Sequence, residues 1–320
     1  MEKRKKISIA GSCYNESGNI RELYDRCMAE LKKFPDYDYE FVMADNCSTD
    51  DTREKLRQLA AEDKNFKVIF NANNFGPINS GMNSFCATTG DAVIQIAADL
   101  QDPPEMISQF IKKYEEGFDV VCAIKVASQE NPVIFAMRKL YYRVLDKFSQ
   151  TPMLQNFTGY GLYSRRVVDA VKSYNDFSYF RGVIAEIGFN RTTIPFEQPL
   201  RKYGKSSYNI FTYYDYAMTG FVNYTKIPLR LAVFCGTFLA IICLLVAMGY
   251  FIAKLIWWNT FSLGIAPLVI GIFFLAAMQL LFIGVLGEYI GAIWTQVKNR
   301  PLVIEEERIN FDKNEKGKTE

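Results

Sequence analysis

The chain has 320 residues, of which 49% are hydrophobic and 22% are charged, and its formal net charge is only +2. That balance argues against a nucleic-acid partner, which calls for a strongly basic face. The sequence contains no histidine, so histidine metal ligands, a histidine general base and a Ser-His-Asp triad are all excluded. Its seven cysteines are odd in number and form no CxxC pair, which favours a reduced, cytosol-facing domain over a disulfide scaffold.

Short apolar runs alternate with helical patterns along the first part of the chain. The first run follows the basic segment Met1–Lys6 and stops at Ala10, too early for the core of a signal peptide, so we expect a strand there. The alternation predicts right-handed βαβ units and a mostly parallel sheet, the α/β class. The expected strands are Ile7–Ala10, Phe41–Ala44, Phe66–Phe70, Ala92–Ala97 and Asp119–Ala123, and the expected helices are Asn19–Phe34, Asp51–Asp63, Asn79–Thr88 and Pro103–Glu116.

Three polar loops follow the first, second and fourth of these strands, at residues 12–16, 45–50 and 98–104. Ligands of such sheets bind beyond the carboxyl ends of the strands, so these loops form the candidate site. The first loop lacks GxGxxG, which argues against a nicotinamide or flavin enzyme. Asp45 resembles the acidic residue that binds ribose in dinucleotide folds, whereas Ser48 and Thr49 are better explained as caps of the next helix.

The third of these loops carries a dense group of oxygen donors, Asp99, Gln101 and Asp102. Mg²⁺ or Mn²⁺ bound to a diphosphate typically takes one or two carboxylates, and phosphates and water complete its shell. We therefore expect Asp99 and Gln101 to bind such a metal. Asp102 precedes Pro103 and Pro104, and the alternative for it is the N-cap of the following helix.

Two long uncharged runs near the C-terminus, Leu231–Ala253 and Leu255–Gly287, predict two membrane spans, because roughly 20 apolar residues cross a bilayer. A turn is expected near residues 261–264, before Pro267. The alternative is a helical hairpin buried in a soluble core. Glu288 lies near the end of the second span, where we expect an interfacial structural role.

Positive charges flank the pair of spans and put both termini in the cytoplasm. These charges are Lys226 and Arg230 before the spans and Lys298 and Arg300 after them, while only Lys254, beside Trp257 and Trp258, lies between. The aromatic segment 208–224 suits a helix in the headgroup layer, or alternatively core packing. The charged tail after Pro301 is expected to be loose. The expected division is a catalytic domain at 1–207, juxtamembrane helices at 208–229, two spans within 230–297 and a cytoplasmic tail at 298–320.

Taken together, these residues resemble the GT-A fold family 2 glycosyltransferases. The resemblance is strongest to their polyprenyl-phosphate branch, which includes the bactoprenol glucosyltransferases and dolichol-phosphate mannose synthase. It covers nearly the whole chain. The segments that carry it are YNES at the start, ADNCSTDDT, NNFG at 73–76, GDAVIQIAADLQDPPE at 90–105, EEGFDVV at 115–121, RKYGKSSYN at 201–209, IPLR at 227–230 and GVLGEYIGAIWTQVKNRP at 284–301.

The resemblance implies an inverting transfer of a sugar from a nucleotide-sugar, by resemblance a UDP-sugar, to polyprenyl phosphate on the cytoplasmic leaflet. It implies a multi-pass protein of the plasma membrane with a metal, Mg²⁺ or Mn²⁺, on Asp99 and Gln101. Arg201 and Lys205 are then expected to meet phosphate oxygens of donor or lipid, or else to be solvated. The oligomeric state, including a homo-oligomer, stays open. The implied donor-binding residues are Tyr14, Asn15, Glu16, Asp45, Asn74 and Asp99.

The sequence departs from the family pattern at two positions. Ala97 stands where the metal motif usually has its first aspartate, and Gly159 stands where this branch often has a candidate catalytic aspartate. A lipid phosphate monoester has a second pKa near 6, so it is largely an anion at neutral pH and attacks without a strong base. Glu186 is the best remaining carboxylate to act as a base or to orient the acceptor. The alternative is that Glu186 is an exposed helix residue without a catalytic role.

Two other functions are compatible with the same residues. A transferase of this fold that acts on a lipid-linked oligosaccharide has a neutral hydroxyl acceptor and requires a real base. A non-catalytic membrane scaffold is suggested by Ala97 and Gly159, and it predicts no metal-dependent nucleotide binding.

Overall fold

A central sheet of eight strands organises the part of the chain that the computed structural model describes. Four neighbouring strands, β4, β1, β2 and β3, run parallel, while β6 and β8 join them on either side in the antiparallel direction. The described residues are 4–127, 154, 156–174, 180–199, 201, 218, 227–256, 265–298 and 300–312. The strand order is β7-β5-β6-β4-β1-β2-β3-β8, with β1 at Lys6–Cys13, β2 at Asp38–Asp45, β3 at Phe66–Asn71, β4 at Ala92–Gln95, β5 at Val120–Ala127, β6 at Phe157–Ser164, β7 at Arg191–Glu197 and β8 at Glu305–Ile309.

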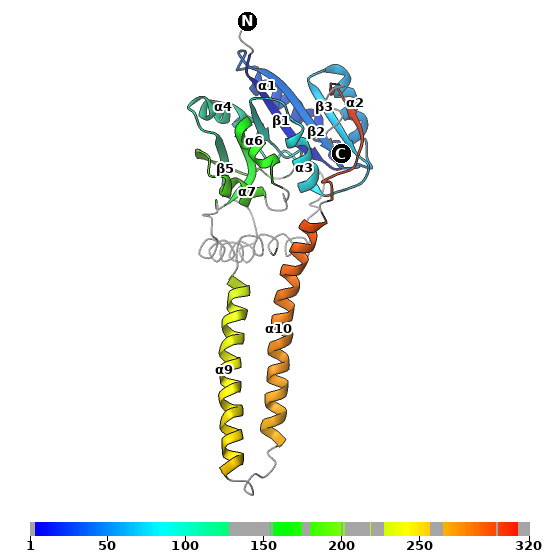
Figure 1. Ribbon diagram of the computed structural model, residues 1–320. Coiled ribbons are helices and arrows are strands. Elements are labelled where there is room, and N and C mark those ends of the chain that lie inside the picture. Colours follow the sequence, from blue (N-terminus) through cyan, green and yellow to red (C-terminus); the bar gives the residue numbers. More distant parts are fainter. Residues whose placement is uncertain are drawn as a thin grey trace.

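Helices cover both faces of the sheet, because its central strands are apolar on both sides (Figure 1). Helices α1 (Ile20–Leu31), α2 (Thr52–Glu62) and α4 (Ile107–Glu115) bury their apolar faces in one core, together with alternate β1 residues such as Ile7. Helices α3 (Pro77–Cys86), α6 (Arg165–Lys172) and α7 (Phe180–Ile187) bury theirs on the opposite face, around residues such as Val93. The expected α/β class with a mostly parallel sheet is confirmed. All nine strands and helices expected before residue 124 are present, with the fourth helix divided into a 3-10 turn, η1 (Pro104–Met106), and α4.

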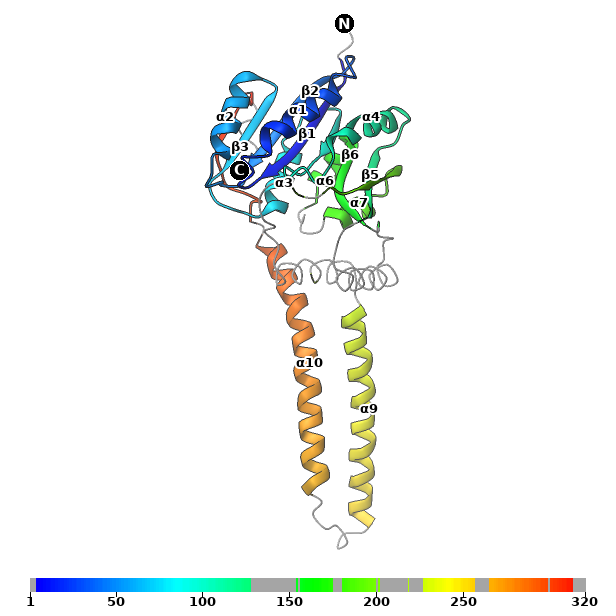
Figure 2. The same cartoon turned by 180° about the vertical axis from the view of Figure 1, so that it is seen from behind.

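Two long helices, α9 (Ile227–Ile256) and α10 (Ile265–Val297), project together from one end of the α/β domain (Figures 1 and 2). They contact each other, and at 1.5 Å per residue they are about 45 and 50 Å long. Among the described residues, one stretch is long and apolar enough to cross a membrane, Phe274–Trp294 in α10, whereas α9 carries the shorter apolar stretch Leu229–Leu239. None of the α10 stretch is buried, so the alternative of a hairpin enclosed in a soluble core is wrong for it.

The segment after α10 returns to the sheet, so the expectation of a loose tail is wrong for residues 300–312. There, β8 pairs antiparallel with β3, and the side-chain amide of Asn310 donates to the carbonyls of Ala60 and Phe66 at 2.7 and 2.8 Å. The charged composition of this segment predicted a loose tail, but the charged residues of β8 have partners far away in the sequence. The expected juxtamembrane helices at 208–229 lie almost entirely outside the described residues, as do Trp257 and Trp258.

Candidate active site

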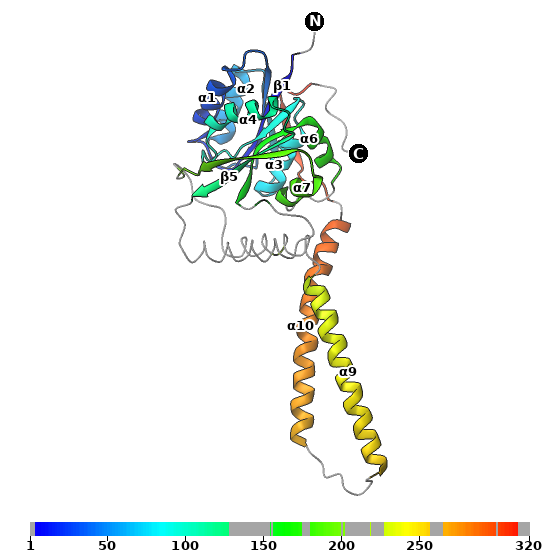
Figure 3. The same cartoon turned by 90° about the vertical axis from the view of Figure 1, so that its left-hand side faces the viewer.

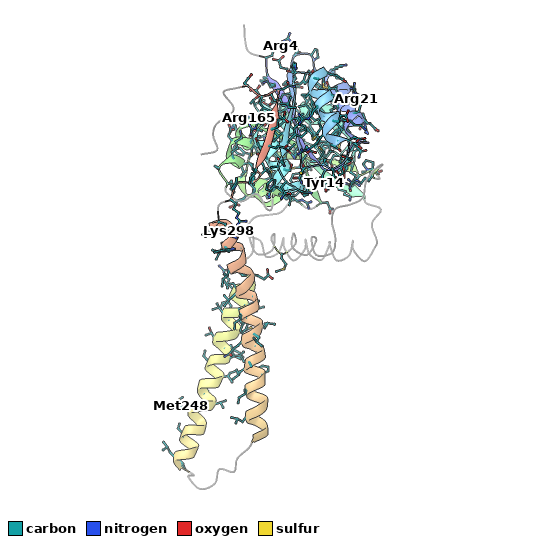
Figure 4. The ribbon with its side chains drawn as sticks, turned by 90° about the vertical axis from the view of Figure 1, so that its right-hand side faces the viewer. Arg4, Tyr14, Arg21, Arg165, Met248 and Lys298 are labelled. Atoms are coloured by element: carbon teal, nitrogen blue, oxygen red, sulfur yellow. The ribbon has the colours of Figure 1, made fainter. Side chains whose placement is uncertain are left out.

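The loops singled out from the sequence converge because their strands are neighbours. β1 lies between β2 and β4, and its last residue, Cys13, is in register with Asp45 at the end of β2. On the other side, the Ile96 N–H donates to the Ala10 carbonyl at 2.9 Å, so the chain after β4 leaves beside the end of β1. Figure 4 places Arg4 at the end of the domain far from the helix pair and Tyr14 at the end that faces it. Figure 3 shows the two helices leaving the domain from the end where Tyr14 lies. The candidate site therefore faces the apolar helices.

Asn15 braces the first loop against the second. Its φ is +56°, a left-handed conformation that Asn tolerates better than most residues. Its backbone N–H donates to Ser48 Oγ at 2.9 Å, and its side-chain oxygen accepts the Thr49 N–H at 2.8 Å. Tyr14 beside it is 37% exposed. Asn15 thus shapes the site while Tyr14 borders it.

Glu16 and Arg201, 185 residues apart in the sequence, form an ion pair in this site. Glu16 is only 6% exposed, and its other carboxylate oxygen accepts the Asn19 side-chain amide at 2.5 Å. Burial raises the pKa of Glu16, the bonds from Asn19 and Arg201 oppose that rise, and the negative charge of Asp99 adds to it. The loops after β1 and β4 are therefore close enough to interact electrostatically. Arg201 therefore lies beside the loop that follows β1, whereas Lys205 lies outside the described residues.

The carboxylate of Asp45 is completely buried, and its hydrogen-bond partners belong to the protein interior beneath the loop at residues 45–50. Its oxygens accept the backbone N–H of Ser48 at 3.2 and 3.3 Å and Nε of Arg53 at 2.7 Å. The sequence reasoning did not single out Arg53. A signal existed: Arg53 stands in the first turn of α2, where a cation is unfavourable beside the helix dipole unless a specific partner holds it.

A network of asparagines fixes the loop between β3 and α3. Of these residues, only Asn74 was identified from the sequence. The buried Asn46 donates through its side-chain amide to Asn74 Oδ1 at 2.7 Å and accepts the Phe75 N–H at 2.9 Å. Asn71 donates to Ser80 Oγ at 3.0 Å. Asn74 itself is exposed, and its oxygen also accepts the Gly76 N–H at 3.0 Å, so it both holds this loop and borders the site.

The loop after β4 divides its carboxylates between two tasks. Asp102 is buried and accepts the Ala97 N–H at 2.9 Å, and burial raises its pKa to about 7. It does not cap the following helix, which has no side-chain cap, so that alternative is wrong. Asp99 is half-buried and accepts the Gln101 N–H at 3.1 Å. Within the described ranges no three Asp, Glu or Cys side chains are grouped so that they could hold a metal ion.

Two positions bear on the catalytic base: Gly159, where the family often has an aspartate, and Glu186, the remaining candidate carboxylate. Gly159 is buried in β6 with φ +96°, and its carbonyl accepts the Tyr163 hydroxyl at 2.7 Å. A φ of this size favours glycine over residues with a side chain. Glu186 is exposed on α7, whose opposite face buries Val183 and Ile184. Its placement agrees with the exposed-helix alternative.

Comparisons with known proteins identify the family. Residues 8–172 match the family described as Glycosyl transferase family 2. The chain is 31% identical to the SfII prophage-derived bactoprenol glucosyl transferase of Shigella flexneri, over 93% of this chain and 97% of that protein. It is 30% identical to the uncharacterized glycosyltransferase sll0501 of Synechocystis sp. (strain ATCC 27184 / PCC 6803 / Kazusa), over 93% and 94% of the two chains. A mannosyltransferase structure from Pyrobaculum calidifontis, PcManGT in complex with GDP-Man and Mn²⁺, is 17% identical with a TM-score of 0.46, covering 93% and 89% of the two chains, a level that supports no further conclusion.

Proposed function

The chain belongs to glycosyl transferase family 2, and from that premise we propose that this glycosyltransferase moves a sugar from a nucleotide-sugar to polyprenyl phosphate at a cytoplasmic membrane surface. One structural observation carries the proposal. The polar loops after β1, β2 and β4 converge on the end of the domain that faces a pair of long apolar helices (Figure 4). A water-soluble donor and a lipid phosphate meet most readily at such a place. The bactoprenol glucosyl transferase relatives, similar over nearly their whole length, support the same acceptor class.

The donor nucleoside binds over the first two loops in this proposal. Tyr14 supplies exposed ring surface, and Asn15 with Asn74 shapes the loops beside it. Asp45 is buried, so we propose that it acts through the loop it holds, by its bonds to the Ser48 N–H. Resemblance favours UDP as the nucleotide.

The donor diphosphate lies beside Asp99 in this proposal. Asp99 and Gln101 would hold Mg²⁺ or Mn²⁺, which supplies positive charge to the leaving diphosphate. Ala97 contributes no carboxylate, so the protein offers few ligands and the diphosphate offers the rest. Arg201, now paired with Glu16, provides a planar fork suited to phosphate oxygens, and Lys205 provides a second cation.

An oxygen of the lipid phosphate attacks C1 of the sugar, and the bond from C1 to the diphosphate breaks on the opposite side. The result is inversion at C1. Because a phosphate monoester is largely ionised at neutral pH, no protein base has to remove a proton. The exposed position of Glu186 and the glycine at 159 fit an acceptor of this kind better than a hydroxyl acceptor.

We further propose that both α9 and α10 cross the membrane, with the α/β domain in the cytoplasm. The strands before α9 and the strand after α10 belong to one sheet, so both ends of the helix pair lie on the same side. A crossing by the apolar stretch of α10 therefore requires a return crossing, and α9 is long enough to make it. Arg230, Lys298 and Arg300 at the domain end of the pair support the cytoplasmic side.

The test is a transfer assay on the full-length protein in detergent with undecaprenyl phosphate and a panel of radiolabelled UDP- and GDP-sugars. Mg²⁺ or Mn²⁺ is supplied, and a matched reaction contains EDTA. We expect one donor to label the lipid, the product to be labile to mild acid, and EDTA to abolish labelling. If no donor labels the lipid phosphate, the proposal is wrong, and labelling of a lipid-linked oligosaccharide in a parallel reaction would identify the other acceptor class.

A further inference from the structure

We propose that β8, the strand that follows the membrane helix α10, is a positioning element of the donor site. It acts through Glu306 and Arg53 on the loop at residues 45–49. Neither Arg53 nor Glu306 is expected to touch the donor. The donor-binding part of this inference rests on the function proposed above.

Arg53 joins three elements of the fold through three separate nitrogen donors. Nε donates to the Asp45 carboxylate at 2.7 Å, one terminal nitrogen donates to the Asn71 carbonyl at 2.8 Å, and the other donates to Glu306 at 2.9 Å. These acceptors lie at the end of β2, at the end of β3 and in β8. Since the guanidinium is planar and rigid, its three bonds fix the orientation of the whole group. Moving any one acceptor therefore disturbs the contacts of the other two.

The position of the Asp45 carboxylate decides the shape of the loop. Asp45 has no exposed surface, and Arg53 is its ion-pair partner; a buried carboxylate that loses such a partner is strongly destabilising. Its remaining contacts are to the Ser48 N–H across the turn, and Cys47 inside that turn has φ +63°. If the Asp45 carboxylate moves, this turn loses the hydrogen bonds between Asp45 and the Ser48 N–H. The same turn receives the Asn15 brace from the first loop.

A bulge in β8 aims Glu306 at Arg53. Phe70 of β3 is in register with Glu307, but the next residue, Asn71, is in register with Glu305, so Glu306 is the extra residue of an irregular pair. In a regular strand, Glu306 and Glu307 would point to opposite faces of the sheet. Here both bind arginines of α2: Glu306 binds Arg53 and Glu307 binds Arg57. Bulges of this kind redirect a side chain. Here the redirected side chain is Glu306, which supplies the third hydrogen-bond acceptor of Arg53.

The two glutamates of β8 provide a matched pair of variants. Glu306 and Glu307 are 55% and 43% exposed, and each pairs with an arginine of α2 that lies over the Phe70 ring. The Arg57–Glu307 pair has two bonds, at 3.1 and 2.6 Å, whereas Arg53–Glu306 has one. Glu307→Gln therefore costs at least as much local stability as Glu306→Gln, but Arg57 pairs with Glu307 and not with Asp45. If β8 contributed only to stability, the control Glu307→Gln would change the loop and nucleotide binding as much as Glu306→Gln does, or more.

The experiment uses full-length protein in detergent and three measurements on each variant. Hydrogen exchange is followed in the peptide that covers residues 45–52, without nucleotide. The affinities for UDP and GDP are measured by calorimetry with Mg²⁺ or Mn²⁺, and KM for the donor is measured apart from kcat. For Glu306→Gln we expect faster exchange of the loop and a two- to fivefold loss of nucleotide affinity, seen as a raised KM at unchanged kcat. Glu307→Gln should leave all three at the wild-type values.

Arg53→Lys gives a second variant, since lysine keeps the charge but cannot hold three acceptors in one plane. It should move the same measurements in the same direction and further than Glu306→Gln. The inference is overturned if Glu306→Gln matches the wild-type protein, or if both glutamate variants change by the same amount. A wild-type protein that binds neither nucleotide would overturn the proposed function instead, and hydrogen exchange would still decide whether β8 controls the loop.

Discussion

The buried carboxylate of Glu40 should make the stability of the domain fall steeply in acid. Glu40 is 2% exposed in β2, and its carboxylate accepts hydrogen bonds from Ser8, Thr89 and Gly90. Burial by itself would raise its pKa, but hydrogen bonds from Ser8 and the Thr89 N–H, together with Lys67 at 3.0 Å, lower the pKa to about 2. These contacts tie β1 and β2 to the turn before β4, and the loops of the candidate site follow those three strands.

The magnitude follows from the difference between the folded and unfolded pKa values. A fall from the ordinary value of 4.5 to about 2 corresponds to about 3 kcal/mol of stability, at about 1.4 kcal/mol per pKa unit. Because the folded pKa is the lower one, this contribution is fully present above about pH 5 and is lost as the pH falls toward 2. Glu40→Gln should lose a similar amount at pH 7, because the neutral amide loses its charge interaction with Lys67 and cannot accept through both terminal atoms.

The assay is thermal unfolding of the full-length protein in detergent, followed by intrinsic fluorescence between pH 3 and pH 7. The wild-type midpoint should fall as the pH decreases through this range, and the Glu40→Gln midpoint should be lower at pH 7 and less dependent on pH. Glu62→Gln is the control, since its pair with Arg21 is more than half exposed and is worth less than about 1 kcal/mol. A Glu40→Gln protein as stable as the control at pH 7 would refute this reasoning.

Three further predictions concern the site itself. If Asp99 binds the diphosphate metal as proposed, Asp99→Ala should abolish transfer and leave the unfolding midpoint unchanged, because a half-exposed side chain contributes little to folding. Full activity of this variant in the transfer assay would refute the proposed metal site. Gly159→Ala should destabilise the domain by about 1–2 kcal/mol, because φ +96° disfavours an L side chain, and thermal unfolding at wild-type stability would contradict this. Glu186→Gln should keep transfer to undecaprenyl phosphate within about threefold of wild type, since an ionised acceptor requires no base. A loss of a hundredfold or more in kcat would instead assign Glu186 as the base and favour a hydroxyl acceptor.

The sequence by itself determined the elements whose burial is periodic and local. Alternating apolar runs located the strands and helices of the first half, and the rule for parallel sheets identified three loops that do converge. Two long uncharged runs located the apolar helices. Of the site residues proposed from pattern or resemblance, Asn15, Glu16, Asn74, Asp99 and Arg201 lie in or beside the converging loops.

Tertiary structure decided which side chains are paired and which are hidden. The sequence pattern favoured a ligand role for Asp45, but only the fold shows its complete burial against Arg53. Likewise, only the fold brings Arg201 to Glu16 across 185 positions. The charged segment after Pro301 is poor in core residues, yet it adds a strand because the edge of β3 supplies backbone partners and α2 supplies arginines. Hydrophobic periodicity reports only whether a residue faces the core. The partners of a charged residue depend on segments that folding brings together, and local pattern carries no record of them.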